Sequence, residues 1–312
     1  MAPASSSSSF DEEYSISRTV CVMDASGPLG SSLVDRLLQQ GYTVHAALQN
    51  HDYSQVFERL CVENSKNLKV FHTDPFDYQS IVDALKGCSG LFYNFEPPHD
   101  QPTFDEFMAE VEVRTAHNVL EACAQIDTID KIVFTSSVTA VIWGEGRKST
   151  RDFDERNWSD VNFCKKYKLW YALSKTVSEK MAWALAMDRG LSMVTVNAGL
   201  LLGLDLSIAS PYQKGAPEMY EDGVFVTVDL KFLVDAHICV YEDVSSYGRY
   251  LCFNHIVNRP EDAIKLPQMS TPDSASPPRS SWDYTRTFEQ RISNKKLNTL
   301  MVEFARSGSI ME

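Results

Sequence analysis

Short apolar runs and helix-like segments alternate along the chain from residue 18 to about residue 203. The apolar runs have the length of strands and are rich in β-branched residues. The segments between them repeat apolar residues every three or four positions, as amphipathic helices do. Parallel strands need long crossovers, and a helix supplies one. The alternation therefore predicts an α/β fold with a doubly wound parallel sheet and helices on both faces.

Six strands, separated by helices, are expected in this region. The strands are expected at residues 18–23, 43–48, 68–72, 90–95, 131–135 and 192–202, and the helices at 28–40, 52–64, 78–86, 103–125 and 168–189. After residue 204, Pro and Gly interrupt this rhythm. Strands at 224–228 and 250–253 and helices at 232–241 and 295–304 are expected there, and they suggest a smaller α+β substrate lobe.

The chain is interpreted as three regions. Residues 1–17 form a tail, 18–204 the doubly wound domain and 205–312 the substrate-binding lobe, whose chain can interleave with that domain. The tail is a Ser run followed by acidic residues, and it lacks the features of a secretory signal or a transit peptide, so we expect disorder. The Pro- and Ser-rich stretch 267–283 is expected to be a mobile surface loop.

Composition excludes several functional classes. The chain has 29 Lys and Arg against 42 Asp and Glu, a formal charge of -13, which argues against binding to nucleic acid or an anionic membrane surface. It lacks the run of about 18 uncharged apolar residues that a membrane span needs. The seven cysteines are scattered without a CxxC pair, which predicts no metal site and a reducing compartment. We expect a cytoplasmic protein.

A glycine-containing turn follows the first expected strand and opens the first helix. In a Gly-x-x-Gly-x-x-Gly turn, the glycines allow a tight bend, a close approach to pyrophosphate and close helix–strand packing. Gly27 and Gly30 hold the second and third places, whereas Asp24 holds the first. Asp tolerates a left-handed backbone better than most residues, so the turn can survive. The turn predicts dinucleotide binding, although a strand–turn–helix that binds nothing would have the same sequence pattern. The residues of the turn that are predicted to contact the cofactor are Asp24, Ser26, Gly27, Pro28, Leu29 and Gly30.

A second set of residues has the types and spacing of a proton relay. Tyr171 and Lys175 are four positions apart on one expected helix, so they share a face. An adjacent ammonium lowers the pKa of a phenol, which lets the Tyr exchange a proton near neutral pH. Ser137 ends the fifth strand, where ligands bind in such sheets, and can donate to a carbonyl oxygen. A surface Tyr/Lys pair and a loop-capping Ser are the simpler alternatives for each alone.

Together the glycine-containing turn, Ser137 and the Tyr171/Lys175 pair resemble the extended short-chain dehydrogenase/reductase family. The resemblance is strongest to its plant cinnamoyl-CoA reductase and dihydroflavonol reductase group. Further matches are residues 41–44, 87–92, 133–137, 154–160 and 248–250. Residues 22–26 and 157–164 look most like the grass cinnamoyl-CoA reductase-like proteins, which are linked to phenylpropanoid and lignin metabolism and to defence.

The resemblance implies that residues 18–204 are an NAD(P)-binding Rossmann domain and that Ser137, Tyr171 and Lys175 are the catalytic triad. It implies NADP(H) as cofactor, with NAD(H) left open. It also implies a small phenolic carbonyl or CoA thioester as substrate, and a monomer or homodimer. Asp74 matches an acidic residue that the family has near the adenine.

Several residues depart from the family pattern. Gln49 stands where an Arg usually grips the 2′-phosphate of the cofactor, and Ala198 replaces the Pro that abuts the nicotinamide. Glu96 stands among residues that are usually small. In the cinnamoyl-CoA reductase signature around Tyr171 and Lys175, four positions differ, which puts cinnamoyl-CoA itself in doubt as the substrate; they are Leu169, Ala172, Leu173 and Ser174.

Three hypotheses follow from these residues. The leading one is an NADP(H)-dependent reductase. A non-catalytic regulator or scaffold with weakened cofactor binding is the alternative, and Asp24, Gln49, Glu96 and Ala198 motivate it. An epimerase or dehydratase of nucleotide sugars would share the fold and the triad, with phosphate anchors at Lys214, Lys231 and Arg249.

Overall fold

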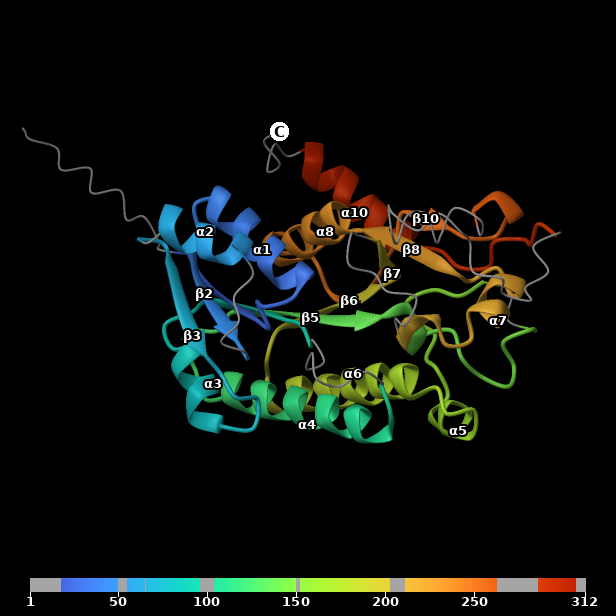
Figure 1. Cartoon of the computed structure of the whole chain (residues 1–312), viewed down its shortest axis with the longest axis horizontal. Helices are drawn as coiled ribbons and strands as arrows, with labels where there is room; N and C mark the ends of the chain where they lie inside the picture. Colours follow the sequence, from blue (N-terminus) through green and yellow to red (C-terminus); the bar gives the residue numbers. More distant parts are fainter. Residues whose placement is uncertain are drawn as a thin grey trace, which may run out of the picture.

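Seven parallel strands form the central sheet of the molecule (Figure 1). The computed structural model describes residues 18–49, 55–64, 66–95, 104–149, 152–202, 211–262 and 286–306. In sheet order the strands are β3 (Leu68–His72), β2 (Thr43–Leu48), β1 (Thr19–Met23), β4 (Gly90–Tyr93), β5 (Lys131–Ser137), β6 (Met193–Ala198) and β9 (Gly248–Cys252). The direction of winding reverses between β1 and β4, so the predicted doubly wound parallel sheet is confirmed.

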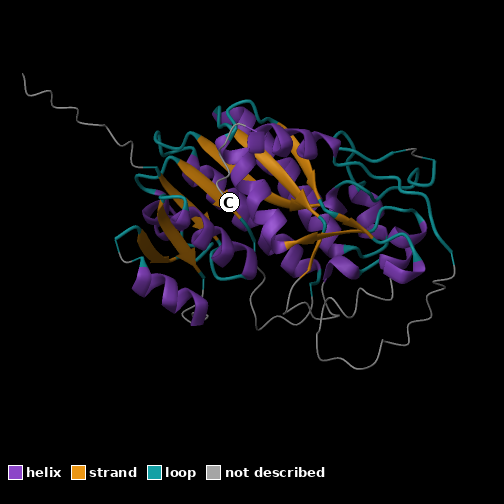
Figure 2. Ribbon diagram, turned by 90° about the horizontal axis from the view of Figure 1, so that it is seen from above, coloured by secondary structure: helices purple, strands orange, loops and turns teal. Residues whose placement is uncertain are grey.

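Helices cover both faces of this sheet, as Figures 1 and 2 show. One face carries α1 (Pro28–Gln39), α2 (Gln55–Glu63), α8 (Leu230–Glu242) and α10 (Lys295–Arg306); the other carries α3 (Tyr78–Leu85), α4 (Glu106–Cys123) and α6 (Trp170–Arg189). Side chains alternate along a strand, so Val22 of β1 packs in the core under the first face and Met23 in the core under the second. The strands are buried on both sides, which explains their nearly continuous apolar runs.

Local sequence sets the ends of the helices that build the site. The carboxylate of Asp105 caps α4 by accepting a hydrogen bond from the backbone N–H of Met108 at 2.9 Å. Gly190 ends α6 with a φ of 70°, a left-handed conformation that suits glycine. Pro28 occupies the first turn of α1, where its missing N–H costs no helical hydrogen bond.

The single strand expected over 192–202 is wrong, because the structure divides it at Gly199. Residues before Gly199 form β6 of the central sheet, whereas β7 (Leu200–Leu202) joins a second, three-stranded sheet in the order β10-β8-β7. A Cβ atom on residue 199 would lie 2.9 Å from the carbonyl oxygen of Val226. Glycine therefore lets the chain leave one sheet and run beside β8 (Val226–Asp229) in the other.

Residues beyond 204 contribute to both parts of the molecule. β9 is an edge strand of the central sheet, and α8 and α10 pack on one of its faces. The sequence pattern grouped these segments with the substrate lobe, whose chain was allowed to interleave with the doubly wound domain. The remaining elements pack around a separate apolar cluster; they are η1 (Val138–Ala140), α5 (Val161–Lys166), η2 (Pro211–Gln213), α7 (Ala216–Glu221), β8 and β10 (His255–Ile256). The boundary at residue 204 stays an interpretation of the sequence.

Three expectations fall outside the described residues: the tail over 1–17, the loop over 267–283, and Glu96. No helix among the described residues is long and apolar enough to cross a membrane. Within the same ranges, no group of three or more His, Cys, Asp or Glu side chains is arranged to hold a metal ion. All seven cysteines are free thiols, and all except Cys61 are buried.

Candidate functional site

The turn after β1 brings the backbone of Gly27 to the start of α1. Gly27 is the N-cap residue with an extended backbone, and no described side chain caps this end of the helix. A helix N-terminus carries unsatisfied N–H groups and partial positive charge, which suits an anionic phosphate. Gly30 lies in the first turn, where a Cβ atom would lie 2.1 Å from the carbonyl oxygen of Asp24. Only glycine fits there, as the turn motif requires.

Asp24 is buried inside this turn, with 2% of its surface exposed. Its Oδ1 atom accepts a hydrogen bond from the backbone N–H of Ser26 at 2.7 Å and another from the Ser26 hydroxyl. The backbone of Asp24 is not left-handed: among described non-glycine residues, only Lys168 has a positive φ, of 53°. The expectation of a left-handed first position is therefore wrong. The turn keeps its shape because the carboxylate folds back onto Ser26.

Tyr171 and Lys175 lie on one face of α6, as their spacing predicts. The Nζ atom of Lys175 lies 5.3 Å from the centre of the Tyr171 ring. Lys175 is 4% exposed, whereas Tyr171 is partly accessible. The Tyr171 ring also packs edge-on against Phe104 and Tyr212, with ring centres 5.3 and 6.3 Å apart. Two aromatic neighbours and one ammonium thus hold the phenol in place.

A cavity of about 220 Å³ lies at the carboxyl ends of β4, β5 and β6. Tyr171 and Lys175 line it together with Leu29 and Ala198, which the sequence also predicted as contacts. The other lining residues are Asn94, Phe95, Thr135, Ser136, Gly199, Leu200, Leu201, Pro211, Tyr212 and Leu233. Ligands bind at this edge in open α/β sheets. The Tyr171/Lys175 pair and Leu29 of the turn therefore meet at one cavity, whereas the other predicted residues of the turn are not part of its lining.

Ser137 lies beside this cavity rather than in its lining. It is the last residue of β5 and caps η1, which packs against α6. Its Oγ atom accepts hydrogen bonds from the backbone N–H and the hydroxyl of Thr139, at 3.1 and 3.0 Å. Because Ser137 Oγ is the acceptor in both bonds, neither of them uses the hydroxyl proton of Ser137, which can be donated to another acceptor. The preceding Ser136 does line the cavity.

A buried carboxylate that the sequence analysis missed ties α6 to the sheet. Glu179 is fully buried and accepts from Ser136 Oγ and Asn197 Nδ2, each at 2.7 Å, and from Arg249 Nε at 2.6 Å. The guanidinium of Arg249 also stacks 3.7 Å above the Trp158 ring. Glu179 lies one helical turn after Lys175, which is the signal that the sequence offered. The network fixes the helix that carries the proton relay.

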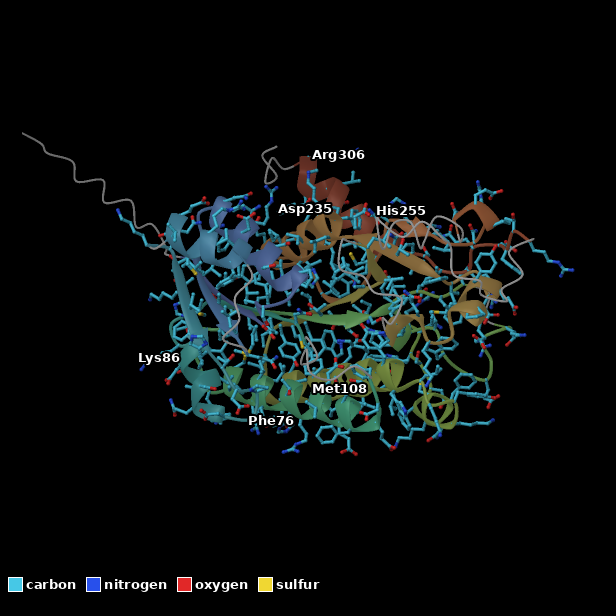
Figure 3. The ribbon with its side chains drawn as sticks, in the orientation of Figure 1. Phe76, Lys86, Met108, Asp235, His255 and Arg306 are labelled. Atoms are coloured by element: carbon cyan, nitrogen blue, oxygen red, sulfur yellow. The ribbon has the colours of Figure 1, made fainter. Side chains whose placement is uncertain are left out.

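A second missed carboxylate lies on α4. Glu112 comes one turn after Met108, which is labelled in Figure 3, and is 1% exposed. Its Oε1 atom lies 2.7 Å from Lys175 Nζ, and its Oε2 atom accepts from the hydroxyl of Ser174. A lone Glu on the otherwise apolar buried face of an expected helix was the available sequence signal. The ammonium of Lys175 thus has a buried carboxylate bound to it.

His237 sets the direction of the Thr135 hydroxyl at the base of the cavity. Its Nδ1 atom lies 2.7 Å from the carbonyl oxygen of Leu233, which can only accept, so Nδ1 carries the proton. Nε2 then accepts from Thr135 Oγ1 at 2.8 Å. Burial lowers the pKa of His237 to about 4, so the ring is neutral at neutral pH.

Gln49 and Asp74 lie apart from the cavity lining. Gln49 follows β2 and is half-buried. Asp74 follows β3, is exposed, and its Oδ1 atom accepts from the backbone N–H of Phe76 at 2.8 Å. Both sit at the carboxyl edge of the sheet, on the side of β1 away from Tyr171. Their roles toward the adenosine part of a cofactor stay predictions.

Two further cavities have different characters. One, of about 300 Å³, has aromatic walls and is lined by residues that include Trp143, Arg147, Phe163, Tyr167, Lys214 and Glu218. Only a narrow space, lined by Leu169, Ala172 and Tyr212 among others, lies between it and the Tyr171 cavity. The larger one, of about 640 Å³, is formed by polar residues of the 152–156 and 290–295 segments. It contains none of the predicted site residues.

Comparison with known proteins shows the family of the chain. Residues 21–197 match the 3-beta hydroxysteroid dehydrogenase/isomerase family. Cinnamoyl-CoA reductase 1 of Petunia hybrida is 35% identical over 298 residues, covering 92% of this chain and 88% of its own. The bifunctional dihydroflavonol 4-reductase/flavanone 4-reductase of Malus domestica is 30% identical, covering 92% of this chain and 86% of its own.

Solved structures of reductases have a similar fold. Vestitone reductase from alfalfa (Medicago sativa) superposes with a TM-score of 0.67 at 26% identity, covering 90% of this chain and 91% of its own. A yeast methylglyoxal/isovaleraldehyde reductase complexed with NADPH has a TM-score of 0.66 at 17% identity, covering 91% and 93% of the two chains. At that identity the likeness concerns the fold alone.

Proposed function

Because the chain belongs to the 3-beta hydroxysteroid dehydrogenase/isomerase family and, within the extended short-chain dehydrogenase/reductases, to the cinnamoyl-CoA reductase group, we propose that it reduces a phenylpropanoid-type carbonyl or CoA thioester. As a member of that family it is an NAD(P)-dependent oxidoreductase. The observation that carries the proposal is the Lys175 ammonium 5.3 Å from the Tyr171 ring, with both side chains lining one cavity at the carboxyl edge of the sheet.

The residues of this chain fit the family's NADP(H) cofactor. The N-terminus of α1 offers N–H groups to the pyrophosphate, and Gly30 keeps the helix close to the strand. Lys175 is within the cavity to bind ribose hydroxyls, and Ala198 offers a small apolar surface to the nicotinamide. The remaining proposed contacts are Asp24, Ser26, Gly27, Pro28 and Leu29 in the turn, and Gln49 and Asp74 toward the adenosine. When bound, the cofactor supplies the hydride.

The side chains of the site supply the proton and orient the carbonyl. Tyr171 gives its phenolic proton to the carbonyl oxygen as that oxygen gains negative charge. The Lys175 ammonium stabilises the resulting phenolate. The family resemblance gives Ser137, which lies beside the cavity, a hydrogen bond to the same oxygen, and its hydroxyl proton is not used by the two bonds that it accepts from Thr139. A ketone or aldehyde thus becomes an alcohol. A thioester becomes a hemithioacetal, whose C–S bond then breaks; the O–H proton leaves with the thiolate, so that an aldehyde and a thiol are released.

The surroundings of Tyr171 suit a planar aromatic substrate. Tyr212 and Phe95 line the cavity, and the neighbouring cavity has Trp143 and Phe163 in its walls. Flat apolar rings pack favourably against such walls. Among the four positions that depart from the cinnamoyl-CoA reductase signature, Leu169 and Ala172 line the narrow space between the two cavities. These two side chains therefore set which member of the substrate class fits.

The cellular setting belongs to the proposal as well. Seven free thiols without a disulfide suit a reducing compartment, so we place the chain in the cytoplasm. Its similarity to the cinnamoyl-CoA reductases supports a role in phenolic or lignin metabolism and defence. We expect a monomer or homodimer, which light scattering after size-exclusion chromatography measures. A larger assembly would contradict this.

Turnover with purified protein tests the function. NADPH oxidation at 340 nm is followed with phenolic aldehydes, ketones and hydroxycinnamoyl-CoA thioesters, and calorimetry measures the Kd of NADPH and NADH. We expect micromolar NADPH binding, turnover of at least one substrate, and a loss of about 10²- to 10⁴-fold in kcat for Tyr171→Phe. Absence of turnover across the panel would reject the reductase function, and full activity of Tyr171→Phe would reject Tyr171 as its proton donor. Absence of binding up to millimolar coenzyme would favour a scaffold.

A further inference from the structure

Glu112 is a fully enclosed carboxylate whose two oxygens both face α6. Oε1 lies 2.7 Å from Lys175 Nζ, and Oε2 accepts from the Ser174 hydroxyl. The side chains of Glu112 and Lys175 are 1% and 5% exposed. A carboxylate removed from water is strongly disfavoured unless it is paired and hydrogen-bonded, and here Lys175 and Ser174 satisfy both oxygens.

We propose that Glu112 is a positioning residue that holds the Lys175 ammonium beside Tyr171 and, through its negative charge, keeps the Tyr171 phenol protonated to higher pH. The inference rests on the proposed function, since it assigns the same Tyr171 and Lys175 as proton relay. It adds a residue of α4 to a site whose other acid–base groups come from α6.

The positioning part follows from the flexibility of lysine. A lysine side chain has four rotatable bonds and loses much entropy when it is held in one place. Here the carboxylate fixes Nζ at 5.3 Å from the Tyr171 ring centre and 5.9 Å from that of Phe95. Phe95 lines the cavity as well. Glu112 therefore determines where the positive charge stands when a ligand enters.

The electrostatic part follows from the sign of the added charge. A lone ammonium favours the phenolate, but an ammonium bound to a carboxylate forms a nearly neutral pair and favours it much less. Carbonyl reduction needs the protonated phenol, whereas alcohol oxidation needs the phenolate. Glu112 thus keeps the proton donor loaded at neutral pH.

The other titratable groups around this point do not replace Glu112. Tyr212 of η2 and Tyr93 of β4 are buried phenols whose pKa values burial raises, so they are neutral near pH 7. His237 of α8 reaches the cavity through Thr135 and is neutral, because burial lowers its pKa to about 4. Asp24, after β1, has its carboxylate bound by Ser26 and is the same in every variant below.

A purely structural role would tie α4 to α6 without touching proton transfer. The chain offers a matched control for that role, because Glu121 of α4 pairs with Arg189 of α6 at 3.0 Å. That pair joins the same two helices at the surface, where the side chains are 24% and 47% exposed. Glu121→Gln removes an α4 carboxylate far from the cavity lining.

The test is the pH dependence of kcat/KM for NADPH-dependent reduction. In Glu112→Gln, the amide oxygen still accepts from Lys175 but the negative charge is gone. The limb at which activity falls with rising pH should move to lower pH by about one unit. Glu112→Asp keeps the charge and should keep the limb in place, with a lower kcat. Glu121→Gln should leave both unchanged. An unmoved limb in a folded Glu112→Gln overturns the proposal.

A measurement without turnover separates this inference from the function. Tyrosinate absorbance near 295 nm is titrated in Glu112→Gln and in the double variant with Tyr171→Phe, and the difference reports Tyr171 alone. The same pair in the wild-type background gives the reference. Titration about one unit lower in the Glu112→Gln background supports the inference even for a substrate that is never found. Equal titration in both backgrounds refutes it, whatever the activity.

Discussion

The Asp24 carboxylate accepts the backbone N–H of Ser26 at 2.7 Å, inside the turn that opens α1. This internal anion uses an N–H group of the turn that would otherwise be available to a phosphate, and it adds negative charge where a polyanionic cofactor binds. We therefore expect the departure at the first position of the glycine motif to support the shape of the turn and to weaken its affinity for phosphate.

Replacing Asp24 should therefore strengthen cofactor binding. We expect Asp24→Gly to lower the Kd for NADPH by about tenfold, equivalent to about 1.4 kcal/mol, measured by calorimetry. Asp24→Asn keeps a hydrogen-bond acceptor for Ser26 without the charge and should fall in between. Thermal unfolding checks that Asp24→Gly loses no more than about 2 kcal/mol of stability. Weaker binding by a stable Asp24→Gly would show that the carboxylate helps to hold the cofactor.

Gly30 is the residue of the turn that packing constrains most. A Cβ atom there would lie 2.1 Å from the carbonyl oxygen of Asp24, so Gly30→Ala must push α1 away from β1. We expect a loss of about 2–3 kcal/mol in the free energy of unfolding, measured with urea. Gly144 is the control, since a Cβ atom there meets nothing closer than 3.9 Å. If Gly30→Ala and Gly144→Ala were equally stable, the turn would be looser than described.

Glu179 should be the most sensitive buried charge outside the cavity. Glu179→Ala leaves the guanidinium of Arg249, whose side chain is 7% exposed, without its carboxylate. Breaking one side of a buried pair typically costs about 3–5 kcal/mol, and we expect a loss of that size in urea unfolding. The surface pair of Glu145 with Lys166 is the comparison, and Glu145→Gln should leave stability unchanged. Equal effects of the two substitutions would contradict the network.

The elements that sequence predicts well here are those with local signals. The alternation of strands and helices, the Gly27–Gly30 turn and the Tyr171/Lys175 spacing all depend on residues within one or two helical turns, and the structure places them as expected. The break at Gly199 escaped because the apolar run continues through it, and only the approach of β8 from elsewhere in the chain requires glycine.

The residues that sequence misses have distant partners. Glu112 binds Ser174, which is 62 residues away, and Glu179 binds Arg249, which is 70 away. Each is a Glu in a helix, where most charged side chains are solvated, so its burial becomes certain only when the helices are packed. Both bind side chains of α6 or join α6 to the rest of the fold, and neither was among the predicted site residues.

His237 makes stability depend on pH in a defined window. The folded protein holds this ring neutral with a pKa of about 4, whereas an unfolded histidine has a pKa of about 6.5. Between these values the unfolded state binds more protons than the folded state, so stability falls as pH drops from about 6.5 to about 4 and does not change above that window. From this group alone, we expect a loss of about 2 kcal/mol in the free energy of unfolding between pH 7 and pH 5.

Substitution of His237 should remove that dependence. His237→Gln keeps a polar side chain near Thr135 but cannot take up a proton, so its free energy of unfolding should fall about 2 kcal/mol less than the wild type over the same interval. His255 is half exposed near Asp229, and His255→Gln is the matched control, which should keep the wild-type slope. Urea unfolding at pH 7, 6 and 5 measures all three proteins. A wild-type slope in His237→Gln would mean that another group, and not the imidazole behind Thr135, takes up the proton on unfolding.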